Sequence, residues 1–359
     1  MKFTILAGGH GAFISTYIFD DEKNTLILAH NSPTGPSPTW LALDPKNRNH
    51  LYAVNEATDG ALQVFKVTKE GHLSAPLDTI SSGGDSPAYA AVLSNRAVGI
   101  VNFSSGTGRI IPTSSDGTKF DTTAGTINFP SQENVSHPHQ VVELNDELLI
   151  PDLGEDTIWR LVKASDGEYT IRGSIPQPEG SGPRHIAVHN DRLFVLHELS
   201  STLSLSPLPS SFSTSPEVLQ TVSIIPLNAP PNSEWHAGEI LIPPSSDNFP
   251  SNAYIYVSNR NVGSEEGRRS LAAKGDPIAI FEHLNKGLTN ERLVLVTHVD
   301  TGLDQVRAMK FSPGGEYLVA AGMTGKGGVV VFKRTERGRN LVEVARNSEN
   351  ETSLSFVWL

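Results

Sequence analysis

The sequence contains no cysteine, and this absence excludes several kinds of site at once. Disulfide scaffolds, thiolate zinc sites and cysteine nucleophiles are all ruled out. Basic residues are also few, since 28 Lys and Arg are set against 39 Asp and Glu, which gives a formal net charge of −11. A nucleic-acid binder needs a concentrated basic surface, so we predict no nucleic-acid partner. No apolar run approaches the length of a bilayer span, so we predict no membrane partner.

Sustained helical periodicity is missing as well. The 31 Gly and 24 Pro interrupt the chain wherever helix-forming residues begin to gather. The first nine residues contain one Lys and a short apolar stretch that breaks at Gly8 and Gly9, which is too short for a signal-peptide core. We therefore expect an intracellular, cytoplasmic all-β protein.

One pattern recurs along the chain: an apolar strand, a polar turn, a second apolar strand and a polar or glycine-rich exit. It begins near Leu41, Ala90, Val141, Ile186, Glu239 and Met309. The repeat spacing is about 45 to 53 residues with one gap of about 70, which is typical of propeller blades. Asp-Pro-Lys-Asn, Asn-Asp and Ser-Pro-Gly-Gly stand between the strand-like runs, and these are turn-forming sequences.

A third strand follows most of these hairpins, for example in residues 61–67 and 328–334. The two ends of the chain lie outside the six repeats, and both have the sequence of a strand. Pairing them would complete a seventh blade and cover the exposed sheet edges. We therefore predict a seven-bladed β-propeller of four-stranded antiparallel blades, closed by pairing of the N- and C-terminal strands, as a single domain over residues 1–359. Residues 206–216 and 261–277 are expected to be inserted, exposed loops.

Polar residues are expected to meet at one mouth of the central channel. The first two strands of a blade form an antiparallel hairpin, so the residue that enters the first and the residue that leaves the second lie on the same face. The candidates at the entries are His137, His139, Arg184 and His185. The candidates at the exits are Asn55, Glu56, Asn102, Asp152, Glu198, Asn259 and Arg260.

This ring is unusual for so acidic a chain, because it gathers arginines, histidines and carboxylates where loops ordinarily carry Gly, Ser, Asn and Asp. Opposite charges around a partly desolvated channel shift pKa values, and arginine binds anions through paired donors. His137 and His139 offer two metal ligands, but histidines two residues apart across a proline have no fixed preference for one face. We predict neither a metal nor a cofactor, and a small-molecule partner.

The chain resembles the seven-bladed propeller lactonases, the group that contains bacterial-type 6-phosphogluconolactonase and fungal carboxy-cis,cis-muconate cyclase. The most specific segment is SGPRHIAVHNDRLFVLHELSSTLSLS, which starts at Ser181 and contains a Pro-Arg-His strand followed by an exit glutamate. Similar segments start at Ser136, Ala253, Leu51 and Val306, so the resemblance spans nearly the whole chain. Two departures stand out: His197 precedes the glutamate where the family usually has Asn, and the last blade lacks the usual polar exit.

The resemblance implies that His139, Arg184, Glu198 and Arg260 are the catalytic residues. From their place in the same ring, the residues expected around the substrate are His137, His185, Asn55, Glu56, Asn102, Asp152 and Asn259. Lactone hydrolysis needs an activated water and positive charge on the developing oxyanion. The sequence does not choose between Glu198 and His139 as the base that activates the water.

Two other functions stay open from the sequence. A carboxymuconate cyclase would use similar groups, with arginines clamping several carboxylates, and would need more positive charge at the mouth. A non-catalytic scaffold that binds partners on one face is a third reading, because propellers host many unrelated activities. The favoured prediction is a lactonase acting on a sugar-acid or related lactone, with oligomeric state left open.

Overall fold

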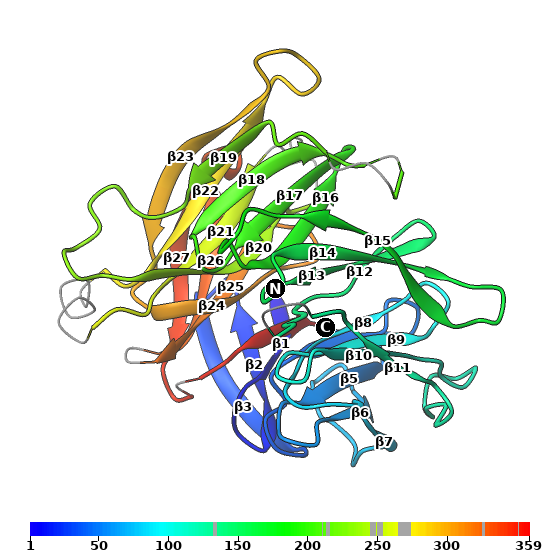
Figure 1. Cartoon of the computed structure of the whole chain (residues 1–359). Helices are drawn as coiled ribbons and strands as arrows, with labels where there is room; N and C mark the ends of the chain where they lie inside the picture. Colours follow the sequence, from blue (N-terminus) through cyan, green and yellow to red (C-terminus); the bar gives the residue numbers. More distant parts are fainter. Residues whose placement is uncertain are drawn as a thin grey trace.

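The computed structural model describes residues 1–131, 135–209, 211–212, 216–244, 249, 254–264, 274–324, 327–350 and 352–359. Its strands form seven four-stranded antiparallel sheets that surround a central axis (Figure 1). The predicted all-β propeller is therefore confirmed, with seven blades of four strands each.

Each blade runs from an innermost strand at the axis to an outermost strand at the rim. Blade 1 contains, in that order, β28 (Ser355–Trp358), β1 (Lys2–Gly8), β2 (Phe13–Asp20) and β3 (Thr25–Pro33). Blade 2 contains β4 (Leu41–Leu43), β5 (His50–Asn55), β6 (Ala61–Lys66) and β7 (Asp78–Ser81). Blade 3 contains β8 (Pro87–Val92), β9 (Val98–Asn102), β10 (Thr107–Ile111) and β11 (Thr126–Asn128). Blade 4 contains β12 (Val142–Leu144), β13 (Glu147–Asp152), β14 (Thr157–Lys163) and β15 (Tyr169–Pro176).

The remaining blades follow the same plan. Blade 5 contains β16 (Pro183–His189), β17 (Arg192–His197), β18 (Thr202–Pro207) and β19 (Gln220–Ser223). Blade 6 contains β20 (Trp235–Leu241), β21 (Tyr254–Asn261), β22 (Pro277–Leu284) and β23 (Arg292–Asp300). Blade 7 contains β24 (Asp304–Phe311), β25 (Tyr317–Thr324), β26 (Gly328–Thr335) and β27 (Asn340–Asn347).

The two ends of the chain meet in blade 1, as predicted. Strand β28 pairs with β1 in antiparallel register from Ile5 opposite Trp358 to Gly8 opposite Ser355. Figure 1 shows the red C-terminal strand beside the blue N-terminal one. This pairing makes the last strand of the sequence the innermost strand of the first blade, so no sheet edge is left open at the seam.

Turn chemistry fixes the hairpin registers. His189 pairs with Arg192, and the two residues between them, Asn190 and Asp191, have φ of 49° and 57°. A two-residue loop with both φ values positive matches the twist of the flanking strands, and Asn and Asp tolerate this conformation better than other non-glycine residues.

The core lies between the blades. Buried apolar side chains of the described residues form seven clusters, and each cluster joins two neighbouring blades. Phe194 of blade 5 packs with Val257 of blade 6, and Tyr17 of blade 1 packs with Val319 of blade 7 across the seam. Each fully buried side chain of this size contributes about 1.5–3 kcal/mol. The inner strands are thereby held rigidly around the axis.

Helix is almost absent from the part of the chain described, where a single 3₁₀ turn occurs at Glu336–Gly338. None of the described helical residues forms a segment long and apolar enough to cross a membrane. Of the two predicted loops, residues 210, 213–215 and 265–273 lie outside the described residues. The ends of those segments extend into β18, β21 and β22.

Candidate active site

Four of the seven innermost strands, β8, β16, β20 and β24, have a β-bulge near their beginning. In β16 the pairing shifts between Pro183 and His185, which leaves Arg184 as the extra residue. In β24 it shifts between Val306 and Ala308, and Arg307 is the extra residue. A bulged residue leaves the regular ladder, and its side chain is re-aimed relative to its neighbours. The bulges therefore place particular side chains at one mouth of the channel.

Four residues predicted from the sequence gather at this mouth. Arg184 Nη1 lies 2.6 Å from Glu198 Oε2 and 2.7 Å from His139 Nε2. Arg260 Nη2 lies 2.7 Å from the other carboxylate oxygen, Glu198 Oε1. His139 comes from blade 4, Arg184 and Glu198 from blade 5 and Arg260 from blade 6. Three blades thus supply one hydrogen-bonded cluster.

The charge state of Glu198 follows from its two arginine partners. Burial alone would raise the pKa of the carboxyl, but Arg184 and Arg260 hold the pKa of Glu198 well below its usual range. The carboxylate is therefore ionised at neutral pH. Burial lowers the pKa of Arg260, which still remains a cation beside Glu198.

Each arginine is also anchored to the backbone of blade 6. Arg184 Nε donates to the carbonyl of Gly238 at 2.8 Å, and Arg260 donates through Nε and Nη2 to the carbonyl of Ala237. Among the described residues, Arg184 Nη2 and Arg260 Nη1 have no hydrogen-bond acceptor. These N–H groups are available to a substrate.

A line of hydrogen bonds runs behind His139. His139 Nδ1 lies 3.2 Å from His185 Nε2, and His185 Nδ1 lies 2.6 Å from Glu239 Oε1. Because Arg184 can only donate, His139 Nε2 is the acceptor and its proton sits on Nδ1. His185 then accepts on Nε2 and donates from Nδ1 to Glu239. Both imidazoles are neutral in this arrangement.

The pKa values of both histidines agree with that proton count. Burial, with the charge of Arg184 next, holds the pKa of His139 well below its usual value. Burial likewise lowers the pKa of His185, although Glu239 opposes the shift. We refer to Glu239, His185 and His139 as the histidine relay.

His137 borders the cluster through an aromatic contact. Its Nδ1 lies 2.7 Å from the carbonyl oxygen of Phe103, and the two rings stack with centroids 4.4 Å apart. The Phe103 ring in turn meets the His139 ring edge-on at 5.7 Å. His137 and Phe103 therefore wall one side of His139.

The other predicted polar residues bond the loops of their own blades. Asn55 donates to the carbonyl of Pro36, Asn102 to the carbonyl of Ser82, and Asn259 to the carbonyl of Ile224. The Asp152 carboxylate accepts from the Ser136 hydroxyl, the Trp159 indole and the His137, Gly154 and Glu155 amides. None of these four side chains has a hydrogen bond to the cluster in the part of the chain described. Their role in substrate binding stays a prediction.

A one-residue offset separates these positions from the cluster. Asn259, His197 and Asn55 each precede a second polar residue, namely Arg260, Glu198 and Glu56. Successive side chains of an extended chain point in opposite directions, so only the second residue of each pair can face the mouth. Glu56 is half-buried, and its charge acts on Arg307.

Three residues at the site were missed by the sequence reasoning. Glu239 ends the histidine relay, and His236 Nδ1 lies 3.7 Å from Glu198 Oε1. Arg307, at the bulge of β24, acts electrostatically on Arg184, Arg260 and Glu198. A usable signal existed for Arg307, because Val-Arg before AMKF stands where Pro-Arg stands before HIAV in the blade 5 repeat.

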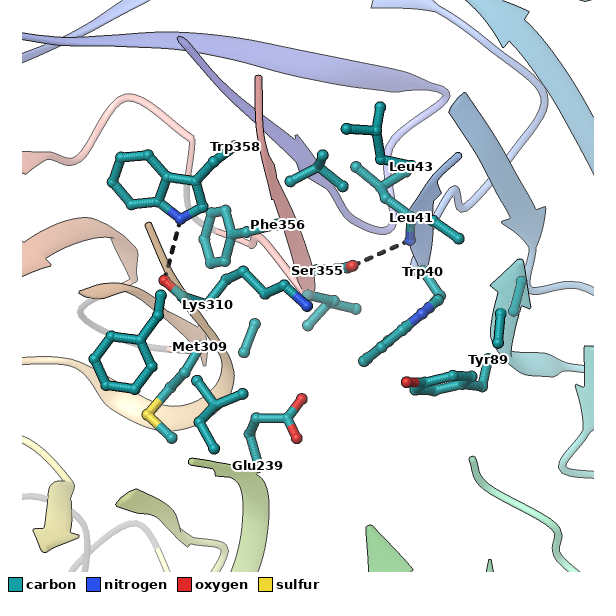
Figure 2. A pocket seen from close by; sticks show the side chains of 18 of the residues that line it. Trp40, Leu41, Leu43, Tyr89, Glu239, Met309, Lys310, Ser355, Phe356 and Trp358 are labelled. Atoms are coloured by element: carbon teal, nitrogen blue, oxygen red, sulfur yellow. Dashed lines mark hydrogen bonds between the residues drawn. The ribbon is translucent and has the colours of Figure 1, made fainter. Parts of the chain in front are cut away.

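Below the cluster, the axis encloses a cavity of about 540 Å³. Figure 2 shows it lined by residues of the inner strands, with Trp40 and Tyr89 stacked on one side and Lys310 extending into it. Glu239 lines this cavity and also ends the histidine relay. The rings of Trp40 and Tyr89 each lie 5.7 Å from the His185 ring. Trp40, Tyr89 and Glu239 therefore contact the histidine relay from the side of the cavity.

The described residues contain no group of three or more His, Cys, Asp and Glu arranged to hold a metal ion. The cluster instead offers arginine N–H donors, one ionised carboxylate and one neutral imidazole. Such groups can bind an anion, orient a water molecule and stabilise an oxyanion.

Comparison with known proteins gives the same picture over the full chain. The family model "Lactonase, 7-bladed beta-propeller" matches residues 3–358. A 6-phosphogluconolactonase of Bacillus subtilis is 27% identical over 91% of this chain and 88% of its own length. A probable 6-phosphogluconolactonase of Arthroderma benhamiae is 23% identical over 98% of this chain and 87% of its own.

Among solved structures, a protein from Lactobacillus plantarum superposes with a TM-score of 0.82 at 21% identity, covering 100% of both chains. That likeness concerns the fold. The family match over nearly every residue, together with the seven closed blades, shows that this chain belongs to the seven-bladed β-propeller lactonase family.

Proposed function

We propose that this protein hydrolyses the lactone of a sugar acid or a related hydroxy acid, of the kind opened by a 6-phosphogluconolactonase. The observation that carries the proposal is the position of Arg184, whose Nη1 bonds both the Glu198 carboxylate and the neutral His139 imidazole. Family membership and the names of the full-length relatives support the same reaction class.

Glu198 is the better candidate for holding the attacking water. A carboxylate has about four lone-pair directions, and Arg184 and Arg260 occupy only one on each oxygen. His139 has a single lone pair, on Nε2, and Arg184 already occupies it. In this state only Glu198 can accept a hydrogen bond from water without breaking a bond of the cluster.

The reaction then balances as follows. Water adds to the lactone carbonyl while Glu198 takes one of its protons, and the carbonyl oxygen becomes an oxyanion. The uncommitted N–H groups of Arg184 and Arg260 stabilise that charge. When the bond between the carbonyl carbon and the ring oxygen breaks, Glu198 returns the proton to the departing alkoxide. A carboxyl of low pKa is a weak base but gives its proton back readily.

The experiment measures the hydrolysis of a panel of aldonolactones, with and without a 6-phosphate. The rate is monitored through the protons released and is corrected for spontaneous opening of the lactone. Arg184→Ala should lower kcat/KM at least about a hundredfold, as loss of an oxyanion donor does. Glu198→Gln should have an effect of similar size. Arg172→Ala, on the exposed face of β15, is the matched control and should leave the rate unchanged. Unchanged rates in both cluster variants would overturn the assignment.

One observation favours a second candidate, a carboxymuconate cyclase. Such an enzyme needs several cations for its carboxylates, and Arg307 supplies a third arginine beside Arg184 and Arg260. Loss of the conjugated absorbance of carboxymuconate, with no lactone opened, would select this reaction. Silence in both assays would favour a non-catalytic propeller scaffold.

A further inference from the structure

Arg184 and Arg307 occupy the same structural position in two different blades. In blade 5 the pairing shifts around Arg184, between Pro183 opposite His197 and His185 opposite Leu196. In blade 7 it shifts around Arg307, between Val306 opposite Gly322 and Ala308 opposite Ala321. The two arginines thus leave the same point of equivalent strands.

The partners of the two arginines differ. The residue after the exit position of blade 5, following His197, is Glu198, which pairs with Arg184. The equivalent residue of blade 7, following Gly322, is Met323. Arg307 Nη1 lies 3.5 Å from the Met323 Sδ, and thioether sulfur is only a weak acceptor. Where Arg184 has a carboxylate from its own blade, Arg307 has an apolar side chain.

Arg307 is half-buried and has no ion pair with any carboxylate in the part of the chain described, although the charges of Glu56 and Glu198 act on it at longer range. Burial, with the charge of Arg184 next, lowers the pKa of Arg307 to about 10, so it is still protonated at neutral pH. A desolvated cation without a counter-ion is unfavourable, and an anion that reaches it gains a strong, charge-assisted contact.

Gly238 brings Arg307 close to the cluster. Its carbonyl accepts from Arg184 Nε, and a Cβ built on Gly238 would lie 3.4 Å from Arg307 Cα. The bulge of blade 6 therefore carries no side chain between the two arginines. The two guanidinium groups are close enough that Arg184 is the largest charge acting on Arg307.

We propose that Arg307 binds an anionic group of the substrate, a phosphate monoester or a carboxylate that lies outside the reacting lactone. The proposal rests on the proposed function and adds to it a residue that determines substrate specificity. Arg184, Arg260 and Glu198 act on the ester, while Arg307 holds the anion and fixes which end of the substrate enters first.

Two variants test the proposal from opposite directions. Arg307→Met removes the charge and keeps most of the volume. Met323→Glu keeps Arg307 but gives it a carboxylate partner like that of Arg184. This carboxylate should pair with Arg307 in place of the anionic group of the substrate. Each is compared on glucono-δ-lactone and on its 6-phosphate. Removing the charge of Arg307 also changes the field at Glu198 and His139, so the readout is the difference between the two lactones. We expect kcat/KM to fall about 10- to 100-fold more for the phosphorylated lactone than for the neutral one, mainly through KM.

A binding measurement separates this inference from the hydrolysis itself. Titration calorimetry with 6-phosphogluconate, a dicarboxylic sugar acid, gluconate and inorganic phosphate needs no turnover. Wild-type protein should bind 6-phosphogluconate, and both variants should lose that binding while keeping their thermal transition and circular dichroism spectrum. If the wild-type protein binds inorganic phosphate as tightly as 6-phosphogluconate, and both variants lose this binding, the anion held by Arg307 is a phosphate. If the wild-type protein binds the dicarboxylic sugar acid more tightly than 6-phosphogluconate, the anion held by Arg307 is a carboxylate.

Equal losses on both lactones, or unchanged binding in Arg307→Met, would overturn the anion assignment even if lactones are hydrolysed. Conversely, binding that depends on Arg307 in a protein that opens no lactone would overturn the proposed hydrolysis and retain the anion site.

Discussion

His139 and Glu198 are joined through a single atom, Nη1 of Arg184, which lies 2.7 Å from the imidazole nitrogen and 2.6 Å from the carboxylate oxygen. Because that nitrogen donates both bonds, the arginine fixes the tautomer of His139 and the ionised state of Glu198 together. The position of the histidine relay is therefore coupled to the Glu198 carboxylate.

The relay gives a test in which a conservative change should rescue function. Glu239 Oε1 accepts from His185 Nδ1 at 2.6 Å and from the Ile240 amide at 2.9 Å. Glu239→Gln keeps an oxygen for both donors, whereas Glu239→Leu removes it and frees His185 to reverse its tautomer. We expect kcat/KM to fall at least about tenfold in Glu239→Leu and to stay within about threefold of wild type in Glu239→Gln.

The tautomer change has its own readout. The ¹⁵N chemical shifts of His139 and His185 should show protonated Nδ1 in the wild type and in Glu239→Gln, and mixed tautomers in Glu239→Leu. Equal activity losses in the two variants, with unaltered ¹⁵N shifts, would mean that Glu239 has only a packing role.

The acidic fall in the pH profile of kcat/KM should lie well below pH 6.5. Arg184 and Arg260, acting against burial, hold the pKa of Glu198 below its usual range, and burial holds that of His139 below its own. Neither group therefore changes protonation between about pH 6 and 7.5. With glucono-δ-lactone, which carries no titrating phosphate, kcat/KM should be flat over that interval after correction for spontaneous opening. His236 also faces Glu198, so the profile is repeated in His236→Gln. A midpoint near pH 6.5 that persists in this variant would contradict the enclosed, neutral state of His139.

Much of this geometry was predictable because it depends on local patterns. Alternating apolar residues and turn sequences such as Asn190-Asp191 indicate the hairpins, and the repeat spacing indicates their number. The hairpin rule then brings His139, Arg184, Glu198 and Arg260 to one mouth although they lie far apart in the sequence. The structure places all four within one hydrogen-bonded cluster.

What could not be predicted depends on register. A bulge changes which face of the strand one residue occupies, and only comparison with the blade 5 repeat, not the segment VRAMKF itself, indicates that Arg307 is the bulged residue. For the same reason the sequence placed both Asn259 and Arg260, and both Asn55 and Glu56, at the mouth, although adjacent residues of a strand face opposite ways. Glu239 was missed for a related reason, because the pairing of β20 shifts between Ala237 and Ile240 and turns its carboxylate toward the axis.

Gly238 should be intolerant of any side chain. A Cβ there would lie 2.5 Å from Ser258 Oγ and 2.6 Å from the Val306 carbonyl oxygen, and the latter belongs to rigid backbone of the next blade. Gly238→Ala should therefore push β20 and β24 apart, at a cost of about 1–3 kcal/mol in unfolding free energy. It should also weaken 6-phosphogluconate binding, because Arg184 and Arg307 flank this residue. Gly180→Ala is not a matched control because Gly180 has positive φ, so Gly314→Ala, with open space around it, serves instead.

Chemical denaturation of the wild type, Gly238→Ala and Gly314→Ala would test that prediction directly. An unfolding free energy for Gly238→Ala equal to that of Gly314→Ala would show that the two inner strands can separate freely at the mouth.

Asp276 should make stability fall as the pH rises toward about 6. Burial raises the pKa of this carboxyl to about 6, although its Oδ2 accepts from the amides of Asn261 and Gln305 at 2.7 Å. A folded pKa above the unfolded value means that the stabilising proton is fully bound below about pH 4 and is lost between about pH 4 and 6. In Asp276→Asn the amide oxygen can still accept from both amides and nothing titrates. The unfolding free energy of Asp276→Asn relative to wild type should therefore rise between pH 4 and 7, by at most about 3 kcal/mol. At pH 4 the folded Asp276 carboxyl is protonated like a neutral amide, and the difference should reach its minimum; a difference that does not change between pH 4 and 7 would show that folding does not raise the pKa of Asp276.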